Sequence, residues 1–136
     1  TMWEVIEHVP EPHSMLAEIK RVLRPGGVLF ITTGDVDSVW ARLTGRFWQL
    51  MTPPQHLYFY TPRSIEIVLE SNGLHCHRIS HDGKRATIDF IGFKAREAFG
   101  AIVSPVQWIV RTCGLGELSV MVNLGDILTC VAEHRH

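Results

Sequence analysis

The chain has 136 residues and a formal net charge of −1, with 46% hydrophobic and 20% charged residues. This length and composition are typical of one globular domain that can bury a sizeable core. Lysine and arginine are scattered along the sequence, so the basic cluster that a nucleic-acid backbone requires is lacking, and no nucleic-acid partner is expected.

The most apolar run and the cysteines indicate where in the cell the protein is expected. Residues 98–110 (AFGAIVSPVQWIV) contain a proline and are too short to span a bilayer, so no transmembrane segment is expected. Cys76, Cys113 and Cys130 are odd in number and lack C-x-x-C spacing. This pattern favours reduced thiols and predicts a cytoplasmic protein.

The first part of the sequence predicts one βαβ unit. Residues 2–6 indicate the end of a buried strand, and residues 12–23 repeat apolar side chains along one helical face. The Arg-Pro-Gly-Gly sequence at 24–27 ends this helix, and the apolar run at 28–33 predicts a strand that is covered on both faces. Because the two glycines follow a helix rather than a strand, they predict a tight turn and not a phosphate-binding loop.

The rest of the chain predicts further helices and strands. Residues 38–50 predict a short helix and an irregular aromatic segment, residues 61–71 a second helix, and residues 74–80 a strand. Residues 84–124 have a helical pattern that glycine and proline interrupt, which we interpret as a helical excursion or cap. Residues 126–133 predict the final strand.

Polar side chains follow the first predicted strand. If that strand ends near residue 6, Glu4, Glu7 and His8 lie at the carboxyl end of a parallel strand, the edge at which open α/β sheets bind ligands. Two carboxylates and an imidazole there can hold a hydroxyl, a ribose or a hard cation. The alternative is that Glu7 and His8 only cap the turn and the helix that follow.

A second set of polar side chains follows the strand at 28–33. Asp35 comes just after that strand, and an aromatic stretch carries Gln55, His56, Tyr58 and Tyr60. His56 is a candidate general base toward an acceptor hydroxyl, because an unperturbed imidazole titrates near neutrality. The alternative is that the aromatic side chains belong to the core and His56 bonds to the backbone.

Three histidines near the strand at 74–80 form a third candidate. His75 and His77 share one strand face, and His81 follows, so a zinc pair is geometrically conceivable. No third ligand is placed nearby by the pattern. Surface histidines on an edge strand explain it better.

Three segments resemble class I S-adenosylmethionine-dependent methyltransferases. Residues 2–33 (MWEVIEHVPEPHSMLAEIKRVLRPGGVLFITT) pass from a strand with a Glu-His pair through Pro-x-Pro to a helix, a Leu-x-Pro-Gly-Gly turn and an apolar strand. Residues 53–74 and 124–133 continue the resemblance. It implies a Rossmann-like α/β fold with strand order 3-2-1-4-5-7-6 and an antiparallel last strand.

The sequence departs from this family pattern in one respect. The family's Gly-rich cofactor loop and its ribose-binding acidic residue precede the fourth strand, and the chain contains no G-x-G-x-x-G. We therefore expect residues 1–136 to form a single partial methyltransferase domain, the carboxyl-terminal half of the fold (strands 4-5-7-6), with the amino-terminal strands missing. An unpaired edge at residues 2–6 would then favour self-association.

The resemblance also implies cofactors and the residues that hold them. S-adenosylmethionine is expected to contact Met2, Trp3 and Glu4. Glu4, Glu7 and His8 match a metal-binding pattern of quinone-type O-methyltransferases, which makes Mg²⁺ a candidate second cofactor.

The leading hypothesis is methyl transfer to a small-molecule acceptor, with His56 or His8 as the base. The acceptor is expected to meet Asp35, Trp48, Gln55 and Tyr58 in the protein from which this half derives, while the chain alone is expected to be inactive. The alternative is a non-catalytic methyltransferase-like domain that acts in protein association. Its mark would be the loss of polar groups at the strand edge, yet those groups are present.

Overall fold

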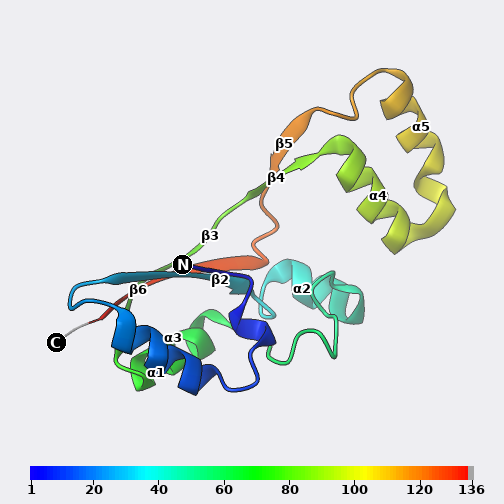
Figure 1. Cartoon of the computed structure of the whole chain (residues 1–136). Helices are drawn as coiled ribbons and strands as arrows, with labels where there is room; N and C mark the ends of the chain where they lie inside the picture. The colour runs from blue at the N-terminus through cyan, green and yellow to red at the C-terminus, as the bar shows by residue number, and fades with distance from the viewer. Residues whose placement is uncertain (135–136) are drawn as a thin grey trace. The chain divides into compact units, whose positions relative to one another are not determined.

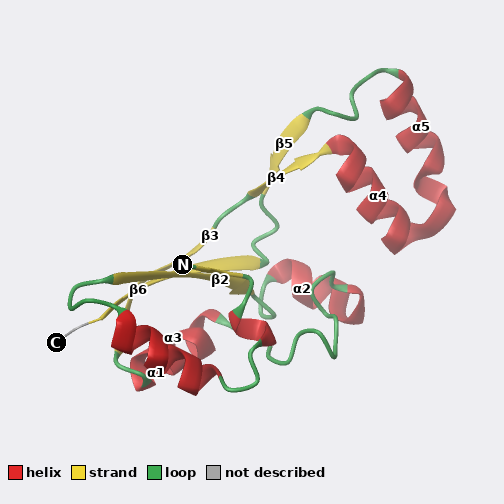
Figure 2. Cartoon of the chain, in the orientation of Figure 1, coloured by secondary structure: helices red, strands yellow, loops and turns green. Residues whose placement is uncertain are grey.

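A computed structural model describes residues 1–134, apart from the side chains at positions 84, 85, 94, 97–99 and 101. The chain divides into two compact units (Figures 1 and 2). Unit 1 contains Thr1–Asp82 and Leu124–His136, and unit 2 contains Gly83–Asn123.

Unit 1 begins with the βαβ arrangement that the sequence predicts. Strand β1 (Met2–Trp3) pairs in parallel with β2 (Val28–Gly34), and helix α1 (Pro12–Val22) connects them. Proline in the first turn of α1 loses no hydrogen bond, because the first N–H groups of a helix lack intrahelical partners. After the helix, the Gly27 N–H donates to the Arg24 carbonyl at 2.7 Å, so the Pro-Gly-Gly sequence forms the predicted tight turn.

Strand β1 is shorter than the sequence indicates. It ends at Trp3, and Glu4 adopts a left-handed backbone conformation with φ 54°. The Glu4 N–H still donates to the Thr32 carbonyl at 3.0 Å, after which Ile6–His8 form a 3₁₀ turn, η1. The expectation of a strand that reaches residue 6 is therefore wrong, because the chain turns away from β2 at Glu4.

The main sheet contains four strands in the order β1-β2-β6-β3. Strand β6 (Ile127–His134) lies antiparallel to both β2 and β3 (Leu74–His81). This order and the antiparallel last strand match those expected for strands 4-5-7-6 of a Rossmann-like methyltransferase fold.

The core of unit 1 lies between this sheet and two helices. Helices α1 and α3 (Pro62–Ser71) cover one face of the sheet (Figure 1). Full burial of one leucine or isoleucine side chain stabilises a fold by about 1.5–3 kcal/mol. The core side chains are those of Met2, Ile6, Leu16, Leu29, Ile31, Tyr60, Ile65, Leu69, Leu74, Leu128, Cys130 and Ala132.

The opposite face of the sheet is less covered than predicted. Along β2 the side chains of Leu29 and Ile31 are buried, whereas Val28 and Phe30 are 47% and 40% exposed. The expectation of a strand covered on both faces is therefore wrong for the amino-terminal part of β2, because α1 and α3 lie on the same face. At the carboxyl-terminal part, Thr32 and Thr33 point to opposite faces and are both buried.

Two helix starts in unit 1 use side-chain caps. The Ser38 hydroxyl accepts from the Ala41 N–H at the start of α2 (Val39–Thr44), which a 3₁₀ turn, η2 (Gly45–Phe47), follows. At the start of α3, Thr61 and Ser64 form a reciprocal capping box at 3.1 and 2.8 Å. The short helix predicted within residues 38–50 and the helix predicted at 61–71 are thus confirmed.

Unit 2 combines helices with a two-stranded ladder. Strands β4 (Lys84–Thr87) and β5 (Ser119–Val122) pair in antiparallel fashion. Between them lie α4 (Ile88–Phe99), the 3₁₀ turn η3 (Gly100–Val103) and α5 (Ser104–Thr112). The sequence pattern indicated the helices but not the two strands. Across the described part of the chain, none of the helices has the length and apolar character needed to cross a bilayer.

The capping box of α3 provides a test of this fold. Thr61→Ala removes the hydroxyl that satisfies the Ser64 N–H, so we expect the free energy of unfolding of the chain to fall by about 1 kcal/mol. Urea unfolding followed by circular dichroism measures the change. Ser71→Ala is the control, because the Ser71 hydroxyl donates to the Val68 carbonyl of its own helix and accepts from the neighbouring Asn72 side chain, and so caps no helix start. Equal stability of the two variants would contradict the capping role.

Candidate functional site

Glu7 lies at the centre of the first candidate site. Its side chain is 3% exposed, and its carboxylate accepts a hydrogen bond of 2.9 Å from the Thr33 hydroxyl near the end of β2. Its backbone carbonyl accepts from the N–H groups of Leu57 and Tyr58 at 2.8 and 3.3 Å. One residue thus joins η1, the carboxyl end of β2 and the segment at 55–58.

The same segment brings two imidazoles together. Nδ1 of His8 lies 2.7 Å from the Gln55 carbonyl, and Nδ1 of His56 lies 2.6 Å from the Leu50 carbonyl. The ring centroids are 4.7 Å apart in an edge-to-face arrangement. A carbonyl can only accept, so each Nδ1 carries the proton, and Nε2 of each neutral ring keeps its lone pair.

Glu7, His8 and His56 therefore form one cluster. Each offers one ligand atom, and these three atoms lie within 4.8 Å of one another. The three side chains are buried, exposed and half-buried respectively, so the cluster is anchored inside and reaches the surface. It brings together the two histidines that the sequence suggested separately as bases.

Tyr60 lies near this cluster, and its buried hydroxyl is unusual in its hydrogen bonding. Its side chain is 4% exposed, and among the described residues its hydroxyl has no hydrogen-bond partner. Burial, followed by the charges of Tyr58 and Glu7, raises the pKa of Tyr60 to about 12. The hydroxyl therefore stays protonated at neutral pH.

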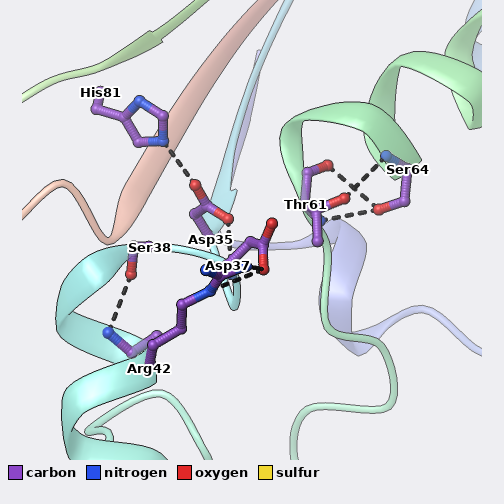
Figure 3. Close-up of polar contacts among 8 residues, drawn as sticks. Asp35, Asp37, Ser38, Arg42, Thr61, Ser64 and His81 are labelled. Atoms are coloured by element: carbon purple, nitrogen blue, oxygen red, sulfur yellow. Dashed lines mark hydrogen bonds and ion pairs between the residues drawn. The ribbon is translucent and has the colours of Figure 1, made fainter.

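A second polar group lies at the end of β2. Asp35 is 4% exposed, and its carboxylate pairs with Nε2 of His81 at 2.7 Å and accepts from the Asp37 N–H at 2.9 Å (Figure 3). Asp37 in turn pairs with Arg42 at 2.7 Å. The Asp35 carboxylate is thus already engaged by two donors.

Trp48, a predicted acceptor contact, is placed in the interior. It is 2% exposed, and its indole N–H donates to the Asp126 carboxylate at 3.1 Å. Its ring passes so close to Gly34 that a Cβ there would lie 2.9 Å from the ring. Glycine at this position lets the indole pack over the end of β2.

The other predicted acceptor contacts lie near the cluster. Gln55 is exposed and provides the carbonyl beside His8. The Tyr58 hydroxyl donates to the Pro10 carbonyl at 3.0 Å. These contacts hold the segment at 55–58 against η1.

The predicted cofactor contacts follow one another at the end of β1. Met2 is 5% exposed and belongs to the core, whereas Trp3 is 59% exposed. Glu4, with its left-handed backbone, is exposed and is not part of the three-residue cluster. Strained backbone of this kind is often found at binding sites, where the surrounding structure maintains it.

The histidines on β3 each have a carboxylate partner. His75 pairs with Glu70 at 2.8 Å, and His77 pairs with Glu133. Their rings lie 5.1 Å apart, but in the described part of the chain they join no third ligand.

Sequence reasoning did not foresee the roles of Thr33 and Asp126. The sequence pattern places Thr33 only in a strand, yet its hydroxyl donates to the Glu7 carboxylate. The Asp126 carboxylate accepts from the indole N–H of Trp48. Polar residues at strand ends were the available signal, since buried polar groups need partners.

The chain resembles known proteins in both sequence and structure. A family model described as "Methyltransferase domain" matches residues 1–79, more than half of the chain. The human protein named ubiquinone biosynthesis O-methyltransferase, mitochondrial, is 35% identical over 77 residues. That match covers 52% of this chain and 21% of the human protein, so the chain spans about a fifth of this curated relative.

Solved structures share the fold. An S-adenosylmethionine-dependent methyltransferase of Thermotoga maritima matches with a TM-score of 0.56 and 14% identity, covering 98% of this chain and 54% of that one. A chain from the complex of the Haloferax volcanii Trm112 methyltransferase activator with a methyltransferase matches with a TM-score of 0.55 and 17% identity. That match covers 98% of this chain and 52% of the other. At these identities the structures demonstrate a shared fold.

Tyr60 provides a test of the site as described. The chain has two tyrosines, and spectrophotometric titration of the folded chain should show one ionising near a pKa of about 12. Because the folded state holds this proton above pH 10 while the unfolded state releases it, the free energy of unfolding should fall between pH 10 and about 12. Tyr60→Phe should remove the late ionisation step and reduce that fall. A late step that persists in the variant would show that another group causes it.

Proposed function

The chain belongs to the methyltransferase domain family, and we propose that it is part of an enzyme that transfers a methyl group from S-adenosylmethionine to a small-molecule acceptor. The name of the human relative and the imidazole pair both favour a hydroxyl as the acceptor group. The proposal concerns the whole protein, since this chain spans about a fifth of that relative.

The observation that carries the proposal is the cluster of Glu7, His8 and His56. It follows a parallel strand at its carboxyl end, and this edge is where open α/β sheets bind their ligands. Because Nδ1 of each imidazole faces a carbonyl, Nε2 is the ring atom that can accept a proton from an acceptor hydroxyl. A buried carboxylate beside them stabilises the imidazolium that forms.

The residues at the end of β1 fit one wall of a cofactor pocket. Trp3, the last residue of β1, offers an exposed aromatic surface, and the left-handed backbone of Glu4 bends the chain away from β2 there. We propose that Met2, Trp3 and Glu4 hold the methionine part of S-adenosylmethionine. When bound, this cofactor supplies a methyl group made reactive by the positive charge on its sulfur.

The residues of the chain then have separate tasks. The imidazole of His56 or His8 takes the acceptor's proton, while Gln55 and Tyr58 shape the approach to the pair. Asp35 is a further acceptor contact in this proposal, through the Asp35–His81 pair at the end of β2. Proximity and alignment supply most of the rate, as in other transfers between two bound reactants.

The non-catalytic alternative, a domain that acts in association through the edge at Met2–Trp3, is less favoured. A domain kept only for association has no need of Glu7, His8 and His56 in one cluster, because burying an unneeded carboxylate is costly. A clean monomer in gel filtration would weaken the association hypothesis further.

Isothermal titration with S-adenosylmethionine tests the cofactor wall. Because the sequence contains no Gly-rich cofactor loop, we expect the 136-residue chain to bind weakly, and Trp3→Ala to weaken the residual binding. Tight binding by this chain would contradict the view that it carries only one wall of the cofactor pocket. Binding that is unchanged in Trp3→Ala would contradict the assignment of Trp3 to that wall.

Substitution of the imidazoles in the enzyme tests the proposed base. With catechol as the probe acceptor, His56→Gln is expected to lower kcat about a hundredfold or more, because general-base catalysis contributes about 10²–10⁴-fold. Formation of S-adenosylhomocysteine measures the rate. The loss should shrink as the pH rises and the acceptor ionises by itself.

His77→Gln is the matched control, since His77 on β3 pairs with Glu133 on β6 and lies outside the cluster. It should retain the kcat of the unmodified enzyme. The proposed base is wrong if His56→Gln and His8→Gln both retain full kcat across the pH range.

A further inference from the structure

We propose that Cys76 and Cys130 are a reversible thiol–disulfide site that a peroxide oxidises. The two residues lie on neighbouring strands of the main sheet, Cys76 on β3 and Cys130 on β6, and both are free thiols in the structure. The pair shares no residue with the cluster of Glu7, His8 and His56, so this inference does not depend on the proposed function.

The two sulfur atoms are already in contact. Sγ of Cys76 lies 3.0 Å from Sγ of Cys130. Non-bonded carbon atoms settle about 3.5–4.0 Å apart, and sulfur is larger than carbon, so no other atom fits between the two thiols. An S–S bond is about 2.0 Å long, so an approach of about 1 Å by the two sulfur atoms is enough to form it.

Strand pairing brings the two cysteines together, although they are 54 positions apart in the sequence. The antiparallel register of β3 on β6 shifts between Cys76 and Arg78. Cys76 packs against the core cluster to which Cys130 belongs, so both side chains lie on the same face of the sheet. The Cys76 N–H donates to the Glu70 carboxylate of α3 at 3.0 Å, which holds this part of β3 in place.

The two thiols differ in their environment, and this difference gives them separate roles. Cys130 is fully buried, whereas Cys76 is half-buried. Burial, followed by the hydrogen bond and the charge of Cys76, raises the pKa of Cys130, which therefore remains a thiol at neutral pH. A small oxidant meets Cys76 first. A buried cysteine often only fills space in a core, but that role does not require a second, half-exposed thiol in contact with it.

The reaction with hydrogen peroxide has two steps. The Cys76 thiolate attacks one peroxide oxygen, so that an S–O bond forms, the O–O bond breaks, and the departing hydroxide takes up the proton that the thiol has lost. Cys76 is then a sulfenic acid. The Cys130 sulfur attacks the Cys76 sulfur, the S–S bond forms, and the hydroxyl of the sulfenic acid leaves with the Cys130 proton as water. The thiols lose two electrons, and one peroxide becomes two water molecules.

The disulfide has two consequences for the chain. It keeps Cys76 from further oxidation to a sulfinic acid, which thiols do not reverse. It also joins β3 to β6 covalently and closes a loop that contains the whole of unit 2, Gly83–Asn123. Because such a cross-link restricts the unfolded chain, the oxidised protein resists unfolding more than the reduced one.

The test is oxidation of the 136-residue chain by hydrogen peroxide. The chain carries Cys113→Ser, because the exposed Cys113 thiol can otherwise link two chains. Thiol titration in denaturant should show that both remaining thiols are lost, and mass spectrometry should show the loss of two hydrogen atoms from a monomer. Dithiothreitol should restore both thiols. Added oxygen with the Cys130 thiol retained, or a disulfide-linked dimer, would overturn the proposal.

Single variants in this background separate the two roles. In Cys130→Ala, the same treatment should add oxygen to Cys76, and dithiothreitol should not remove it once a sulfinic acid has formed. In Cys76→Ala, the buried Cys130 should keep its thiol. Circular dichroism checks that each variant is folded, and the half-buried position of Cys76 makes its variant the safer of the two. Loss of the Cys130 thiol in folded Cys76→Ala, as fast as in the pair, would overturn the proposed order of reaction.

Urea unfolding measures the effect of the cross-link on the fold. Oxidation should lower the unfolding equilibrium constant by about thirtyfold or more, as disulfides typically do, and dithiothreitol should reverse the change. Peroxide also reaches methionines, of which the chain has four, so peroxide-treated Cys76→Ala is the control and should show no such gain. An oxidised pair that is no more stable than the reduced pair would contradict a disulfide formed within the native pairing of β3 and β6.

Discussion

The buried carboxylate of Glu7 is the constraint on which the site depends. Removing a carboxylate from water costs several kcal/mol unless hydrogen bonds compensate, and Thr33 supplies the compensating donor. The Glu7 backbone meanwhile accepts from Leu57 and Tyr58. The 3₁₀ turn, the end of β2 and the segment that carries His56 therefore cannot separate without leaving buried polar groups unpaired.

Much of unit 1 could be predicted from local patterns. The apolar face of α1, the Pro-Gly-Gly turn and the Thr-Pro start of α3 each indicate their element, because helix periodicity and capping are properties of neighbouring residues. The early end of β1 at Trp3 and the ladder between β4 and β5 were not predictable in this way. Strand pairing depends on partners that are distant in sequence, and the short segment KRAT has no strong strand pattern of its own.

The site was predicted in its residue types but not in its grouping. Sequence proximity suggested that Glu4, Glu7 and His8 act together, whereas folding brings His56 to Glu7 and His8. Backbone hydrogen bonds of the segment at 50–58 cause this change, and no periodic pattern indicates such bonds. Trp48 shows a related limit, since an indole serves equally well in a core or at a ligand, and only its bond to a buried carboxylate decides between them.

The two-stranded ladder of unit 2 has a consequence for how this chain can vary. Because β4 and β5 are hydrogen-bonded partners, the chain leaves the first unit and returns to it through neighbouring strands. The register of β3 on β6 then does not depend on how many residues lie beyond the ladder. The main sheet can therefore tolerate changes in α4 and α5, whether these helices are lengthened, shortened or exchanged.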